Sequence, residues 1–109
     1  MQAVPLGKIA VAVPGTPVAL SLTTAQKALL PPSGCVHKIE VWPDPADTGV
    51  VKVLNGGVEV AGLPSPGTAA GGHAQPYEIG HQGNSLPWSP FSIDCTVGTN
   101  GPFVTLWVE

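Results

Sequence analysis

The sequence of 109 residues fits a single domain, and only 10% of its residues are charged, against roughly 25% in an average soluble domain. Its net charge is −3, with four lysines and no arginine. The chain therefore lacks the basic groups that neutralise a row of phosphates, and we expect no nucleic-acid partner. Prolines interrupt the apolar N-terminus, and no apolar run approaches the roughly 20 residues of a membrane span. We expect no signal peptide, no membrane contact and synthesis in the cytosol.

The 14 glycines and 13 prolines would suit a disordered chain, but disorder requires low hydrophobicity and high net charge. This sequence has the opposite balance, with alternating runs rich in valine and isoleucine. Alternation with a period of two is the pattern of half-buried β-strands. The composition therefore favours an all-β domain with short strands and many turns. So few charges also imply that other subunits cover part of its surface.

Two strands are predicted near the N-terminus. Residues 6–13 place Ile9, Val11 and Val13 on one face, and residues 18–22 follow after a Gly/Pro turn. Residues 23–30 fit either a short helix or a crossover that carries a short strand, and we favour the crossover.

The strongest β-hairpin signal spans residues 35–54. Its first strand, residues 35–42, places Cys35, His37, Ile39 and Val41 on the inward face. Pro43 to Gly49 supplies turn chemistry, and the alternation resumes over residues 50–54, with Val51 and Val53 inward.

A long segment over residues 62–90 follows a short edge strand at residues 58–61. The segment is rich in glycine and proline, and a short strand around Tyr77 is its only regular feature. Its few apolar side chains cannot offset the entropy lost on ordering nearly thirty positions. We therefore expect this extended loop to be mobile in an isolated subunit and ordered by neighbouring subunits.

The C-terminal part predicts two more strands, at residues 91–97 and 103–108, joined by a hairpin turn at residues 98–102. In the first of them Phe91, Ile93, Cys95 and Val97 face inward and Asp94 faces outward. With about seven to eight short strands separated by Gly/Pro turns, the chain predicts one antiparallel β-sandwich or small jelly roll over residues 1–109.

Cys35 and Cys95 both fall on predicted inward faces. They could be two buried thiols that pack as small apolar groups. They could also form a disulfide worth roughly 3–4 kcal/mol for a loop of this length. A cytosolic origin argues against the disulfide, and both alternatives stay open.

Metal and catalytic signals are weak. His73 and His81 share the long segment with Glu78, and His37 lies elsewhere, but their spacing matches no metal motif. No nucleophile motif supports a catalytic triad, for which the only members available on paper are Ser85, Ser89, Asp94 and His81. We expect no enzyme activity, no metal and no cofactor.

Three aromatic residues are candidates for interface anchors, because aromatic side chains concentrate in interface cores. They are Trp42 at the end of a predicted strand, Tyr77, and Trp88 between two prolines. We expect one of the three tryptophans, the third being Trp107, to belong to the core. Exposed tryptophans could instead stack on sugars, as in a carbohydrate-binding module.

The order of segments over residues 18–108 shows a further pattern. In chain order the segments are a strand at 18–22, a Cys-containing strand at 35–41, a turn at 45–49, a strand at 50–53, a Leu-Pro segment at 63–67, a polar aromatic strand at 89–94 and a closing strand that ends at Trp107. This order resembles that of small structural proteins of tailed bacteriophages. Residues 71–83 depart from it, because they are longer and richer in Gly and His.

The resemblance implies a non-enzymatic virion component with a β-sandwich fold, foremost a capsid decoration (cement) protein. It implies a location in the virion, contacts with the major capsid protein or other virion subunits, and a homo-oligomer on the particle. A phage tail, baseplate or head–tail adaptor component is the alternative within this class. The alternative from another class is the carbohydrate-binding β-sandwich module.

Overall fold

The computed structural model describes residues 1–65 and 75–109 of the chain. In these ranges it contains eight strands and one short helix. In chain order they are β1 (Gln2–Lys8), β2 (Val18–Ala19), α1 (Thr24–Lys27), β3 (Lys38–Trp42), β4 (Val50–Asn55), β5 (Val58–Pro64), β6 (Tyr77–Gly80), β7 (Phe91–Cys95) and β8 (Phe103–Val108).

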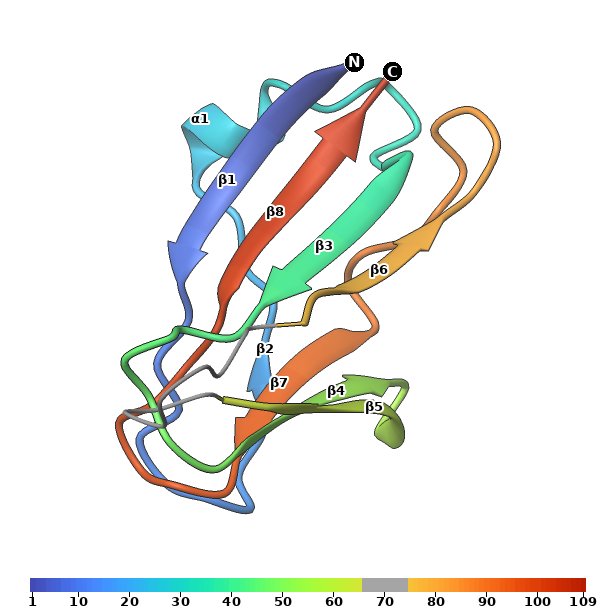
Figure 1. Cartoon of the computed structure of the whole chain (residues 1–109). Helices are drawn as coiled ribbons and strands as arrows, with labels where there is room; N and C mark the ends of the chain where they lie inside the picture. Colours follow the sequence, from blue (N-terminus) through green and yellow to red (C-terminus); the bar gives the residue numbers. More distant parts are fainter. Residues whose placement is uncertain (66–74) are drawn as a thin grey trace.

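The strands form two four-stranded antiparallel sheets (Figure 1). The first sheet has the order β1-β8-β3-β6 and the second has the order β2-β7-β4-β5. Eight strands in this double order are the jelly-roll form of the β-sandwich. The predicted all-β sandwich is therefore confirmed. Both chain termini lie at the same end of the sandwich (Figure 1).

The hydrophobic core lies between the two sheets and follows the predicted alternation. Ile39 and Val41 of β3 pair with Leu106 and Val104 of β8, and all four side chains are buried. The second sheet contributes the buried side chains of Val51, Val53, Phe91, Ile93 and Cys95. Burial of a large apolar side chain stabilises a fold by roughly 1.5–3 kcal/mol, so this one cluster carries most of the stability.

The predicted hairpin over residues 35–54 is wrong in its pairing. β3 pairs with β8 and β6 in the first sheet, whereas β4 pairs with β5 and β7 in the second. The turn between β3 and β4 therefore crosses from one sheet to the other, as does the predicted hairpin turn at residues 98–102. A period of two identifies a strand and its buried face but not its partner.

The local hairpin of the fold is β4–β5 instead. Its two-residue turn is Gly56-Gly57, with φ of 62° and 84°. Two consecutive positive φ angles are the signature of the type I′ turn, which matches the twist of paired strands. β5 is also longer than the short edge strand that we expected.

The N-terminal strand is displaced from its predicted position. β1 ends at Lys8, and the pairing register with β8 shifts between Pro5 and Gly7, where Gly7 has a φ of 75°. Val11 is nevertheless buried, and its backbone N–H donates to Asn100. Val13 is 59% exposed rather than inward. β2 is likewise short, although Leu20 beyond it is buried.

The segment at residues 23–30 forms a helical turn, so the crossover strand that we favoured is wrong. Thr23 caps α1: its hydroxyl accepts from the backbone N–H of Gln26, and the Gln26 side chain accepts from the backbone N–H of Thr23. This reciprocal capping box satisfies two donors that the helix leaves unpaired.

Three predicted faces also need correction, and the first is that of Val97, which is 39% exposed rather than inward. Before β3 the alternation slips, so Val36 is fully buried and forms a bridge with Leu86, whereas Cys35 and His37 are only half-buried. Asp94 was expected in water but is buried, because the chain after β1 covers it. Its carboxylate accepts hydrogen bonds from the backbone N–H groups of Gly15 at 3.1 Å and Cys95 at 2.8 Å.

The long segment over residues 62–90 contains more regular structure than a loop. β5 continues to Pro64, and β6, the strand anticipated around Tyr77, pairs with β3. Leu86 is buried in the core. The middle of the segment, residues 66–74, lies outside the described residues, and with it that part of the stretch expected to be mobile.

Among the glycines that the structure describes, Gly101 has the least room for a side chain. A Cβ at this position would collide with the carbonyl oxygen of Ile9. Gly101→Ala should therefore force the β7–β8 connection away from the end of β1, and we expect a loss of more than about 3 kcal/mol in the free energy of unfolding. Urea unfolding checks this result.

The matched control is Gly62→Ala. A Cβ there would meet its nearest atoms at 3.6 Å, which is ordinary contact. We expect this variant to stay within about 1 kcal/mol of the wild type. Equal losses in the two variants would contradict the tight approach at Gly101.

Candidate functional site

The outer face of the first sheet carries an aromatic surface, which is made by residues of two paired strands, β3 and β8. Residues paired across strands share a face, so Trp42 of β3 lies beside Phe103 of β8, and Lys38 lies beside Trp107. Glu40 and Thr105 form the pair between them. We call the surface formed by Trp42, Phe103 and Trp107 the aromatic face.

The aromatic face is only partly covered. Trp42 is 39% exposed and Phe103 is 43% exposed, although both are large apolar side chains. Their ring atoms point away from the core because Val41 and Val104, their neighbours in sequence, point into it. Exposed aromatic pairs of this kind are unusual on a surface that needs only to face water.

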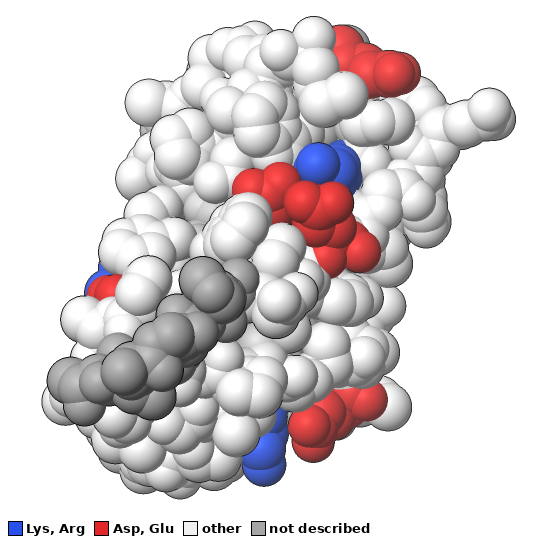
Figure 2. All heavy atoms as spheres, in the orientation of Figure 1, with Lys and Arg blue, Asp and Glu red and all other residues white. Residues whose placement is uncertain are grey.

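A charged group lies in the middle of this face. Figure 2 shows it as a compact set of acidic and basic side chains with uncharged surface around it. Lys38 Nζ lies 3.3 Å from a carboxylate oxygen of Glu40 and 3.7 Å from one of Glu78, which follows on β6. The group therefore contains two carboxylates and one ammonium.

Glu40 links the charged group to the aromatic face. Its carboxylate accepts a hydrogen bond of 2.6 Å from the indole Nε1–H of Trp42. Partial burial on its own would raise the pKa of Glu40, but the hydrogen bonds from Trp42 and Lys38 outweigh it and hold that pKa below its usual value. The carboxylate therefore stays ionised at neutral pH and fixes the orientation of the Trp42 ring.

Trp107 occupies the other end of the face. The Lys38 Nζ lies 5.7 Å from the centre of its ring, within the range of a cation–π contact. Its Nε1–H is buried, and no acceptor for it occurs in the described ranges. Trp107 is half-buried, as is Trp88.

The three aromatic residues proposed from sequence do not form one surface. Trp42 lies on the aromatic face, but Tyr77 pairs with Val41 and so points to the core side of the first sheet. Trp88 packs against the core and donates its Nε1–H to the carbonyl of Gly34 at 2.9 Å. Trp88 is the tryptophan with the clearest core role.

Sequence reasoning missed that Phe103 and Trp107 share a face of the sheet with Trp42, and that Phe103 is its direct neighbour. Their own alternation is visible, since residues 103, 105 and 107 share one face of a strand. The missing information was that β8 lies between β1 and β3, which no local pattern encodes.

The candidate catalytic and metal residues are not assembled where the structure describes them. Asp94 accepts from two backbone groups, and Ser85 donates to the carbonyl of Gln82, so neither bonds to His81. No group of three metal-ligating side chains occurs in residues 1–65 and 75–109. His73 lies outside the described residues.

The two cysteines are free thiols at opposite ends of the sandwich. Cys35 lies before the start of β3, where the backbone N–H of Cys35 donates to the Ser33 hydroxyl. Cys95 ends β7, close to the charges of Asp94 and Asp47. The disulfide considered from sequence is absent from this structure.

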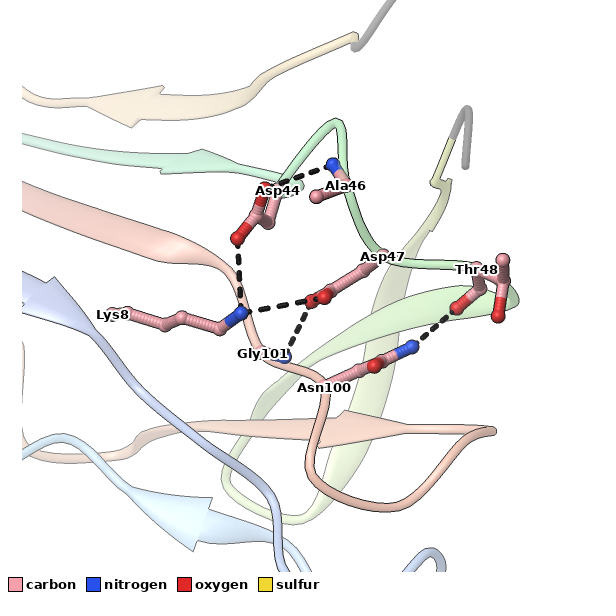
Figure 3. A network of polar contacts seen from close by, with 7 residues as sticks. All are labelled: Lys8, Asp44, Ala46, Asp47, Thr48, Asn100 and Gly101. Atoms are coloured by element: carbon pink, nitrogen blue, oxygen red, sulfur yellow. Dashed lines mark hydrogen bonds and ion pairs between the residues drawn. The ribbon is translucent and has the colours of Figure 1, made fainter. Parts of the chain in front are cut away.

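A second polar cluster closes the opposite end of the sandwich from the chain termini (Figure 3). Lys8 Nζ contacts a carboxylate oxygen of Asp44 at 2.9 Å and one of Asp47 at 3.3 Å. The other oxygen of Asp47 accepts from the backbone N–H of Gly101 at 2.9 Å. Asn100 donates to the carbonyl of Thr48 at 2.7 Å. We call these contacts the Asp47 clasp.

No protein-family model matches the chain, and no curated protein or solved structure is significantly similar to it.

In the described part of the chain, no helix has the length and apolar character needed to cross a membrane.

The two thiols should react at different rates. Burial first, and the charge of Asp94 second, raise the pKa of Cys95 to about 11, so little thiolate forms at neutral pH. Cys35 is only half-buried. In the native protein we expect a maleimide to label Cys35 readily and Cys95 only on unfolding, as measured by mass spectrometry of the intact chain.

Cys35→Ser is the control, because it should remove the fast reaction and leave the slow one. Rapid double labelling of the native wild type would contradict the burial of Cys95.

The Asp47 clasp should give the stability an acid-sensitive component through Asp44. The backbone N–H of Ala46, and then Lys8, lower the pKa of Asp44 below its ordinary value of about 3.9. Ionised Asp44 therefore stabilises the fold above about pH 4, and this contribution is lost as the pH falls through the folded pKa.

Asp44→Asn should accordingly be less stable than the wild type at neutral pH and approach it in acid, as measured by urea unfolding between about pH 7 and pH 3. Lys8→Met should retain part of this pH dependence, because the Ala46 hydrogen bond remains. An Asp44→Asn deficit that is constant over the whole range would contradict the assignment.

Proposed function

We propose that this chain is a non-enzymatic structural protein of a tailed-bacteriophage particle, where it decorates and stabilises the capsid. The order of its segments supports this class, and the jelly roll is a fold that viral capsid proteins use repeatedly. Fold alone does not imply function, so the attachment surface has to come from particular side chains.

The observation that carries the proposal is the surface of β5. Val58 is 66% exposed and Val60 is 45% exposed, and both are β-branched apolar residues on one strand. Within the described residues β5 pairs with β4 alone, and Glu59 is its single charged residue. β5 ends at Pro64, but its other residues include neither lysine nor proline, with which natural proteins usually protect such an edge.

An apolar edge strand offers two kinds of contact to a protein partner. Its backbone N–H and C=O groups can extend a sheet of the partner, and its side chains can fill apolar depressions between subunits. In this proposal, the partner surfaces for both kinds of contact are complete only on the assembled shell. A ligand that binds only the assembled state stabilises that state by mass action. The partner is then the major capsid protein, with further copies of this chain beside it.

The same surface would also serve a subunit of a tail, baseplate or head–tail adaptor. The location of the protein on the particle distinguishes capsid decoration from these alternatives. Immunogold labelling of purified virions would reveal that location. Genes for capsid proteins adjacent to the gene for this chain would favour decoration, and tail genes would favour the alternative.

The attachment surface can be tested with the double variant Val58→Lys/Val60→Lys. Two charges on β5 should weaken binding to stripped capsids at least about tenfold, which corresponds to 1.4 kcal/mol. They should leave the folded domain nearly unchanged, because exposed substitutions shift stability by about 0.5 kcal/mol or less. Co-sedimentation with capsids measures binding, and the melting temperature of the free chain reports folding.

Val13→Lys is the matched control, since the exposure of Val13 is between those of Val58 and Val60 but the residue lies in the β1–β2 connection. It should bind capsids as the wild type does. Equal binding by the β5 variant would refute β5 as the attachment surface, and failure of the wild type to bind any capsid would refute decoration itself.

A further inference from the structure

We propose that the aromatic face is a second binding site, which takes neutral oligosaccharide chains of flat, extended shape, as in β-1,4-linked glucans. This inference goes beyond capsid attachment, because it uses the first sheet, whereas attachment uses β5 of the second.

Trp42 and Phe103 supply the apolar part of the site. The C–H groups on one side of a pyranose ring form an apolar surface that packs on an aromatic ring. Two aromatic side chains directly opposite each other on β3 and β8 make such a platform. The hydrogen bond from Trp42 to Glu40 already fixes the indole orientation. A platform that is ordered before binding loses less entropy when the ligand arrives.

The next pairs along the same two strands supply the polar part. Beside the platform lie Glu40 and Thr105, and then Lys38, with Glu78 adjacent on β6. From Trp42 to Lys38 the strand rises about 13 Å, at roughly 3.3 Å per residue. Sugar hydroxyls both donate and accept hydrogen bonds. A strip with carboxylates, a hydroxyl and an ammonium next to a stacking platform meets both needs.

The charged group makes this face a poor centre for a protein interface. Interface cores are depleted in lysine and glutamate, because both must be desolvated. Glu40 lies between the Trp42–Phe103 pair and the Lys38–Trp107 pair, with Lys38 next to it on its own face of β3 and Glu78 beside it on β6. A hydroxyl-rich ligand instead keeps these groups hydrogen-bonded.

The charge and the shape of the face restrict further the class of oligosaccharide that it could bind. Two carboxylates against one ammonium disfavour an anionic glycan. The platform belongs to a sheet, and the described part of the chain contains no pocket that would enclose a single sugar ring. A flat chain lying along β3 and β8, over both the aromatic platform and the polar strip, fits this surface, whereas a helical α-linked chain does not.

The test is titration of the full chain with cellohexaose, and with maltohexaose as the α-linked chain of the same composition. Isothermal calorimetry gives the affinity, and the indole N–H signals in ¹⁵N NMR spectra report which tryptophan responds. We expect cellohexaose to bind and to shift the Trp42 indole signal, and maltohexaose to bind at least about tenfold more weakly.

Variants of the aromatic residues test whether binding depends on stacking against their rings or only on an intact fold. Trp42→Ala and Phe103→Ala should each weaken cellohexaose binding at least about tenfold. Trp42→Phe keeps an aromatic ring, so it should retain most of the affinity although it loses the hydrogen bond to Glu40. The double variant Val58→Lys/Val60→Lys should bind cellohexaose as the wild type does, which keeps this site distinguishable from capsid attachment.

Two outcomes of the cellohexaose experiments, and one of the capsid-binding experiment, would overturn the proposal. One is the absence of any heat or spectral change with the wild type at millimolar cellohexaose. The other is unchanged affinity in folded Trp42→Ala and Phe103→Ala proteins. A Trp42→Ala variant that loses capsid binding instead would also overturn it, because the face would then serve a protein partner.

Discussion

The buried carboxylate of Asp47 fixes the end of the sandwich that lies opposite the chain termini. One oxygen accepts from the backbone of Gly101 in the β7–β8 connection, and the other contacts Lys8 at the end of β1. Every connection between consecutive strands except β4–β5 joins one sheet to the other. Neither sheet can therefore form alone, and the clasp holds three of the chain segments in the register that the core requires. Gly101 is part of the same constraint, because only a residue without a side chain lets that connection approach Ile9.

This rigid frame presents two different surfaces. The aromatic face lies on the first sheet and combines stacking side chains with a fixed charged group, whereas the edge of β5 in the second sheet is apolar and nearly uncharged. Jelly rolls occur both in viral capsid proteins and in lectins, so the fold is compatible with capsid attachment and with glycan binding and does not distinguish between them. The chemistry of each surface makes the distinction: hydroxyl-rich ligands suit the first, and a protein shell suits the second.

Much of the secondary structure was predictable because strand alternation is a local property. Ile39, Val41, Val51, Val53, Phe91, Ile93 and Cys95 were all expected to be buried and are. Errors arose where a non-local contact overrides the alternation. Asp94 is buried because the β1–β2 connection covers it, and Val36 replaces Cys35 in the core because it pairs with Leu86. At residues 23–30 a helical turn formed instead of the expected strand, because the capping box of Thr23 and Gln26 stabilises the start of α1.

The sequence by itself determined the fold class and most of the core faces of the strands, since period-two burial and the position of proline after a strand are readable from neighbouring residues. Only the tertiary structure decided which strands are partners. The pairing of β3 with β8 brings Phe103 beside Trp42, and the separation of β3 from β4 turns an expected hairpin into a crossing between sheets. The physical reason is that strand pairing depends on contacts between residues far apart in the chain. Many partners satisfy the same local pattern, and the packing of the whole core selects among them.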